Sequence, residues 1–163
     1  MRESLCHAVH KMCRVTLLHR YHISNALRHI EIYRGQPEIL EYLVHHGDCP
    51  QVEIAKEFGV SPASVATSIK RMSKSGLIER TIDEADRRAN KISITEKGKL
   101  VLARGKEECR RIDEKMFTGF SDGEIELFSS MLSRLADNLS PDNMTDKEII
   151  KMFIDEENKE EKE

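Results

Sequence analysis

The segment SPASVATSIKRMSKSGLIERTIDEADRRANKISITEKG, Ser61–Gly98, decides the fold of this chain. Its first part predicts a helix. Ser61 can cap that helix through its side-chain oxygen, and Pro62 suits the first helical position because no amide donor is needed there. Gly76 ends the helix. One face of it is buried, because apolar residues recur at helical spacing at Val65, Ile69 and Met72.

The rest of the segment predicts two strands joined by a charged loop. Apolar and polar residues alternate over Ile78–Ile82 and again over Lys91–Thr95, as in half-buried strands. The residues between them, DEADRRAN, are too polar for a core. A helix followed by a hairpin with a basic tip is typical of a winged helix, and this arrangement predicts binding to duplex DNA.

The residues before Ser61 predict three further helices. Residues 2–33 lack Pro and Gly and predict a long first helix with a break near Tyr21–Asn25, and Pro37 opens a second one. A short helix is expected over Gln51–Phe58. Two short helices joined by a turn that contains Gly form a helix-turn-helix, and the second of them is then the recognition helix.

Two long helices are expected after the wing. Thr95 caps the first, which runs to about Phe117, and a capping box at Ser121 begins the second, which ends before Pro141. Both carry apolar residues at the spacing of helices packed on helices. These seams exceed what a small winged-helix core can cover, so we expect a homodimer. The predicted fold class is mainly α with a small two-stranded β-wing: a winged helix-turn-helix plus a helical dimerisation region.

Charge is distributed unevenly along the chain. The net charge is −3, but residues 61–111 hold 13 basic and 7 acidic side chains, whereas residues 112–163 hold 6 and 15. Positive charge therefore gathers where the neutralisation of phosphates would need it. The predicted parts are an N-terminal dimerisation helix, a winged helix-turn-helix, C-terminal dimerisation helices and an acidic, partly disordered tail, at residues 1–34, 35–98, 99–140 and 141–163.

The sequence argues against several classes of protein. No apolar run approaches membrane-spanning length and MRESLCHAVHK is too polar for a signal peptide, so we expect a cytoplasmic protein with no membrane partner. There is no GxSxG motif and no phosphate-binding loop, so we expect neither an enzyme nor a cofactor. A rival hypothesis is a winged helix used only for protein interaction, which predicts no strong salt-dependent affinity for DNA.

Three motifs in this order, QVEIAKEFGVSPASVATSIKRMSKSGLIER, DEADRR and ISITEKG, resemble the multiple-antibiotic-resistance regulator (MarR) family. The resemblance runs from about Gly35 to Leu139. It implies a transcription repressor that binds a pseudo-palindromic operator as a dimer and is released by a small-molecule or stress signal. It also implies an effector site where the dimer region meets the DNA-binding lobe, lined by the second helix and the start of the post-wing helix.

The resemblance implies roles for individual side chains. Arg88 matches a wing-tip arginine that enters the minor groove, where negative potential is concentrated. Asp86 matches a wing acid that orients the recognition helix by pairing with an arginine, here Arg71. Three polar side chains of the recognition helix are candidates for base edges, namely Ser64, Thr67 and Ser68, and Ala63 is a candidate for contact with a thymine methyl group. The candidates for phosphate contact, with the cap residue, are Lys70, Lys74, Arg80, Arg87, Lys91 and Ser61.

Cysteines and histidines leave two alternatives open. Leu5 and Cys6 resemble the peroxide-sensing branch of the family, whose reactive thiol needs a tyrosine such as Tyr21 or Tyr33. Otherwise Cys6 and Cys13 are small apolar residues in a dimer seam. Relatives that sense zinc use histidines after the wing, where this chain has none, so we expect no metal site. The sets of ligands considered are Cys6, His10 and Cys13, and Glu41, His45, His46 and Cys49.

Overall fold

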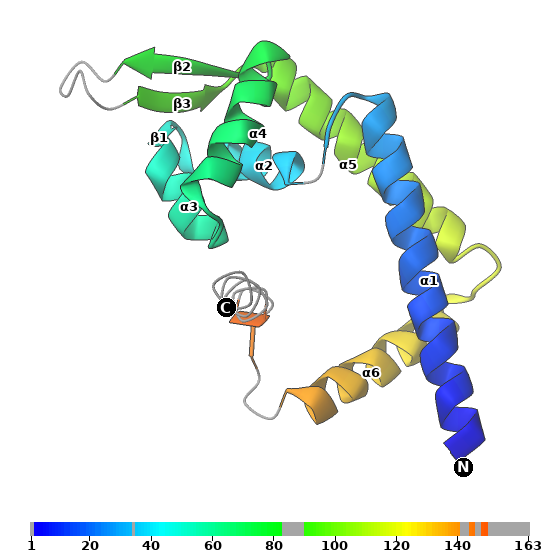
Figure 1. The fold of residues 1–163 in the computed structure, drawn as a ribbon. Helices are drawn as coiled ribbons and strands as arrows, with labels where there is room; N and C mark the ends of the chain where they lie inside the picture. The colour runs from blue at the N-terminus through cyan, green and yellow to red at the C-terminus, as the bar shows by residue number, and fades with distance from the viewer. Residues whose placement is uncertain (1, 34, 83–89, 141–143, 146–147, 150–163) are drawn as a thin grey trace.

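The structure, a computed structural model, describes residues 2–33, 35–82, 90–140, 144–145 and 148–149. Helices α1 and α5 pack side by side, and α2, α3 and α4 form a lobe with a small sheet at one end of α5 (Figure 1). None of the residues of α6 is buried. The elements are α1 Arg2–His29, α2 Gln36–His46, β1 Cys49–Pro50, α3 Gln51–Phe58, α4 Pro62–Lys74, β2 Ile78–Ile82, β3 Asn90–Ile94, α5 Glu96–Met116 and α6 Asp122–Leu139.

The sheet has three strands in the order β1-β3-β2, and all its pairs are antiparallel. The two strands of the wing form as predicted, with Ile78 opposite Ile94. The sequence did not predict the third strand, in which Cys49 pairs with Ile92, whereas α3 has the predicted bounds Gln51–Phe58. A strand of two residues is too short to show alternation, and Pro50 is tolerated because β1 lies at an edge of the sheet.

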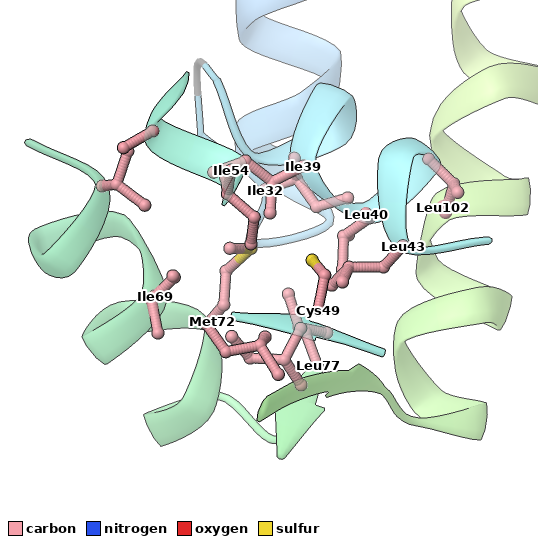
Figure 2. Close-up of a cluster of buried hydrophobic side chains, with 14 residues drawn as sticks. Ile32, Ile39, Leu40, Leu43, Cys49, Ile54, Ile69, Met72, Leu77 and Leu102 are labelled. Atoms are coloured by element: carbon pink, nitrogen blue, oxygen red, sulfur yellow. The ribbon is translucent and has the colours of Figure 1, made fainter. Parts of the chain in front are cut away.

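The hydrophobic core lies inside the lobe (Figure 2). α4 contributes its predicted buried face, and Ile78 and Ile92 contribute from the sheet. Ile32, after α1, and Leu102 of α5 extend the core toward the long helices. Burying each large aliphatic side chain stabilises the fold by about 1.5–3 kcal/mol, so the core determines which face of α4 points outward. The cluster comprises Ile32, Ile39, Leu40, Leu43, Cys49, Ile54, Ala55, Val65, Ile69, Met72, Leu77, Ile78, Ile92 and Leu102.

The first helix is continuous from Arg2 to His29, so the predicted break near Tyr21–Asn25 is wrong. A sharp interruption needs a cause such as Pro or Gly, and this stretch has neither. Its polar residues form contacts within the helix instead. The ring of His29 donates to the carbonyl oxygen of Asn25 over 2.7 Å, so polarity alone did not end the helix.

The predicted caps of the two late helices are confirmed. The hydroxyl of Thr95 accepts a hydrogen bond from the amide of Gly98 at 3.0 Å, and Ser121 forms a reciprocal capping box with Glu124. The acidic tail predicted at residues 141–163 lies mostly outside the described residues. In the part of the chain that the structure describes, no helix combines the length and apolar character needed to cross a membrane.

Candidate nucleic-acid interface

The recognition helix α4 presents a polar and basic face to the outside of the lobe. Its cap is the predicted one, since the hydroxyl of Ser61 accepts from the amide of Ser64 at 3.2 Å. The buried side of the helix anchors it, which leaves the other side accessible. The exposed candidates from the sequence are Ala63, Ser64, Thr67, Lys70, Arg71 and Lys74, whereas Ser68 is half-buried.

The hydroxyl groups of this face are partly engaged within the helix. Thr67 donates its hydroxyl proton to the carbonyl oxygen of Ala63 over 3.1 Å, and the hydroxyl oxygens of Ser61 and Ser64 lie 2.9 Å apart. In this arrangement Thr67 offers only acceptor lone pairs to a ligand. A hydrogen bond from an adenine or cytosine amino group therefore suits Thr67 without any change in its rotamer.

The C-terminal end of α4 is fastened to the start of α5 by two side chains. The ammonium group of Lys97 donates to the carbonyl oxygen of Ser75 over 2.7 Å. The hydroxyl of Thr95 donates to the carbonyl oxygen of Gly76 over 2.7 Å. These bonds satisfy carbonyl groups that a helix end leaves without partners. Lys97 was not a sequence candidate, because its partner is a backbone atom 22 residues away. The recognition helix and α5 are thereby linked directly.

The two basic residues at the base of the wing point to different sides. Arg80 lies opposite Ile92, and Lys91 lies opposite Thr81. Because side chains alternate along a strand, Arg80 and Lys91 project from opposite faces of the hairpin. A single straight stretch of phosphates cannot contact both from the same side. The tip of the wing, with Asp86, Arg87 and Arg88, lies outside the described residues.

Arg71 has a partner that the sequence did not indicate. Its guanidinium carbon lies 4.8 Å from the centre of the ring of Tyr33, which belongs to the linker between α1 and α2. An aromatic ring attracts a cation within about 6 Å of its centre. The linker thus contacts the recognition helix directly.

A cavity of about 380 Å³ lies between α1, α2 and α5. This cavity is lined by α2 and by the middle of α5, from Leu102 to Asp113. The effector site that the resemblance implies, at the second helix and the start of the post-wing helix, stays a prediction. The ammonium group of Lys106 lies 2.5 Å from a carboxylate oxygen of Glu41 and lowers the pKa of Glu41 through this hydrogen bond. Cys109 also lines the cavity, and burial raises the pKa of its thiol.

The two sulfur candidates near the N-terminus, Cys6 and Cys13, are exposed on α1. Tyr21 follows Cys6 by fifteen residues on the same straight helix, which places it about 22 Å away. Tyr33 contacts Arg71 instead. Among the described residues of one chain, neither Tyr21 nor Tyr33 is therefore placed beside Cys6, and the peroxide sensor stays an untested alternative. Among the described residues, no group of three or more His, Cys, Asp or Glu side chains could hold a metal ion.

A second feature of the surface is a run of exposed apolar side chains on α1 and α6. Helix α6 has an apolar seam, yet neither the lobe nor the helix pair α1 and α5 covers it, since none of the residues of α6 is buried. Contiguous apolar surface of this kind marks a place where another protein surface binds. The exposed residues are Leu5, Val9, Met12, Val15, Leu17 and Leu18 of α1, and Leu127, Phe128, Met131, Leu132, Leu135 and Leu139 of α6.

Comparison with known proteins agrees with this geometry. Residues 32–89 match the model of the MarR family. The chain is 28% identical over 109 residues to a Bacillus subtilis protein described as the uncharacterized HTH-type transcriptional regulator YwhA, covering 67% of this chain and 77% of that one. The crystal structure of YusO from Bacillus subtilis superposes with a TM-score of 0.77 at 20% identity, covering 84% of this chain and 98% of that one. A MepR mutant from S. aureus, bound to an oligodeoxyribonucleotide, gives a TM-score of 0.66 at 19% identity, covering 81% and 97%.

Proposed function

Because the chain belongs to the MarR family of DNA-binding transcription regulators, we propose that it is a repressor of transcription that acts as a homodimer. It binds a pseudo-palindromic operator and leaves it when a small-molecule or stress signal is present. The observation that carries the proposal is the outward polar and basic face of α4, which the buried face of the same helix keeps accessible. We place its action in the cytoplasm, as expected of a transcription regulator of this family.

Contacts to DNA divide between two kinds of side chain. Lys70 and Lys74 are exposed on α4 and would neutralise phosphates, which supplies affinity but little sequence information. Ser64 and Thr67 would contact base edges in the major groove. From the resemblance alone we add Arg88, which would enter the minor groove from the wing.

The apolar faces of α1 and α6 support the homodimer. A two-fold axis pairs one surface with itself, so each copy would cover the seam of the other. Such a dimer carries two recognition helices. When both enter the same face of a duplex, the half-sites lie about 10 base pairs apart from centre to centre. The two-fold symmetry of the dimer is the reason for a pseudo-palindromic operator.

The cavity between α1, α2 and α5 is the proposed effector site. Its wall includes the middle of α5, whose first turn holds the end of α4 through Lys97 and Thr95. A ligand that binds better when α5 is displaced would therefore move the recognition helix. Such a ligand releases the operator by favouring the conformation that does not bind DNA.

Selection of DNA by the purified full-length protein tests the proposal. A random duplex library should yield a two-fold symmetric motif, and affinity for that duplex should fall steeply as the salt concentration rises. Lys70→Ala and Lys74→Ala should each reduce the steepness of this salt dependence by about one unit. Arg134→Ala, which removes a charge from α6, is the matched control and should leave it unchanged.

Two results would refute the proposal. Recovery of no enriched duplex, with affinity insensitive to salt, would favour a winged helix that binds only proteins. Enrichment of an asymmetric site bound by one copy would keep the DNA-binding role and remove the dimeric operator.

A further inference from the structure

We infer that Tyr33 is a positioning residue of the recognition helix, which holds the guanidinium of Arg71 ready for contact with DNA. This inference rests on the proposed function. Its basis is the distance of 4.8 Å between the guanidinium carbon of Arg71 and the centre of the ring of Tyr33. Tyr33 lies outside the helix-turn-helix and outside the wing, so it acts on DNA only through Arg71.

The backbone of Tyr33 is held in place by the buried residues Ile32 and Gln36. The preceding residue, Ile32, is only 1% exposed and belongs to the core. Gln36, which is 2% exposed, forms two hydrogen bonds with the backbone of Tyr33. The side-chain oxygen of Gln36 accepts from the backbone amide of Tyr33 at 3.1 Å, and the backbone amide of Gln36 donates to the carbonyl oxygen of Tyr33 over 3.0 Å. Because both polar groups of its backbone are engaged, only the side-chain torsions of Tyr33 remain free.

Stacking leaves Arg71 able to bind a second partner. The guanidinium of Arg71 lies over the ring of Tyr33, and a cation–π attraction of this kind requires no conventional hydrogen bond from the five N–H donors of an arginine. These groups can therefore donate to a phosphate, a base edge or a wing carboxylate while the stack persists. A side chain that is already restrained loses less conformational entropy on binding, so the stack should strengthen DNA binding.

Substitutions at both positions test this coupling, with the duplex recovered by the wild-type protein as the probe. Tyr33→Leu should weaken binding about two- to fivefold, as expected for an exposed cation–π contact. Tyr33→Phe, which keeps the ring, is the matched control and should bind within about twofold of the wild type. In an Arg71→Gln background, Tyr33→Leu should have no further effect.

A measurement on the free protein gives a separate readout. The guanidinium carbon of Arg71 lies over an aromatic ring, so the neighbouring δ-protons should show an upfield ring-current shift by NMR, which Tyr33→Leu removes and Tyr33→Phe keeps. Unchanged dimer mass and unfolding temperature in both variants would exclude a general loss of structure. If Tyr33→Leu does unfold, Arg71→Lys replaces it, because that change keeps the charge and removes the planar face.

Three outcomes would overturn the inference. One is equal binding by the Leu and Phe variants, which would show that the ring does not matter. Another is tighter binding by Tyr33→Leu, which would make the stack a restraint that DNA must break. The third is the absence of the ring-current shift. A wild-type protein that recovers no duplex would instead refute the proposed function.

Discussion

Gly98, in the first turn of α5, packs against the backbone of Leu77 at the start of the wing so closely that no side chain fits between them. A Cβ atom on Gly98 would overlap the carbonyl oxygen of Leu77 and lie 2.8 Å from the side chain of Ile94. The same carbonyl oxygen accepts a hydrogen bond from the amide of Thr95 at 3.1 Å. The junction between the recognition helix, the wing and α5 therefore depends on this glycine.

Replacing Gly98 with alanine should destabilise the protein. Helix propensity alone favours alanine by up to about 1 kcal/mol, but overpacking against atoms that cannot move costs about 1–3 kcal/mol. Since the overlap involves backbone, we expect the second effect to win. Urea unfolding monitored by circular dichroism measures the difference. Gly123→Ala in α6, where the added atom meets open space, is the control and should not lower stability.

Loss of the hydroxyl group at Thr95 should destabilise the same junction on both sides, at the start of α5 and at the turn after α4. Thr95→Val removes the bond from the amide of Gly98 and the bond to the carbonyl oxygen of Gly76. Loss of a cap costs about 0.5–2 kcal/mol of stability. Thr95→Ser keeps the hydroxyl, and its free energy of unfolding should differ from that of the wild type by only about a few tenths of a kcal/mol. Destabilisation by Ser but not by Val would show that the methyl group, not the hydroxyl, matters.

A charge placed on the seam of α6 should dissociate the proposed dimer. Leu132 is 40% exposed in the single chain, so burial of this remaining surface in each of two copies would contribute about 1–2 kcal/mol in all, and an unpaired ammonium group buried in its place would cost several kcal/mol more. Leu132→Lys should therefore raise the dissociation constant of the dimer by roughly a hundredfold or more. Sedimentation equilibrium measures this change, and Arg134→Ala serves as the control on the same helix. An unaltered dimer would mean that α6 is not the interface.

Removal of Lys106 should raise the pKa of Glu41. The hydrogen bond from Lys106 is the largest cause of the lowered pKa of that carboxyl. A carboxyl whose pKa is lowered by folding adds stability at pH values above its unfolded pKa and loses this contribution as the pH falls through its folded pKa. In Lys106→Met, NMR should show that the carboxyl of Glu41 titrates at higher pH. The free energy of unfolding should also decrease less on acidification in this variant than in the wild type.

The size of this effect on stability should be small. Both side chains are about half exposed, and exposed pairs contribute about 0–1 kcal/mol. Lys99→Met is the matched control, because it removes the exposed pair with Glu96 on the same helix and leaves Glu41 untouched. A Glu41 titration that is identical in wild type and Lys106→Met would contradict the ion pair.

Cys49 should resist alkylation in the folded protein. It is buried in the core, and burial raises the pKa of its thiol to about 11 from an ordinary 9.0. At pH 8 the thiolate is then about a hundredfold scarcer than in the unfolded chain. Iodoacetamide labelling followed by mass spectrometry should modify Cys49 only after urea is added. Labelling of Cys49 at equal rates with and without urea would contradict its burial.

The sequence by itself determined the features that depend on near neighbours. The cap at Ser61, the buried face of α4, the alternation in β2 and the start of α5 at Thr95 follow from residues within a few positions of one another. The resemblance to a family also predicts which face of α4 reads DNA, and this stays a prediction. The same local reasoning failed in α1, where polar residues near Asn25 were mistaken for a break.

Only the tertiary structure decided the contacts that join distant segments. The pairing of Cys49 with Ile92, the bond from Lys97 to Ser75 and the stack of Arg71 on Tyr33 have no local pattern. Each one forms because burial of the core brings two distant elements together. Many other pairs of polar residues are compatible with the same local patterns, so those patterns do not select the pair that forms. Sequence periodicity shows which face of an element is buried, but not which residue of another element lies beside it.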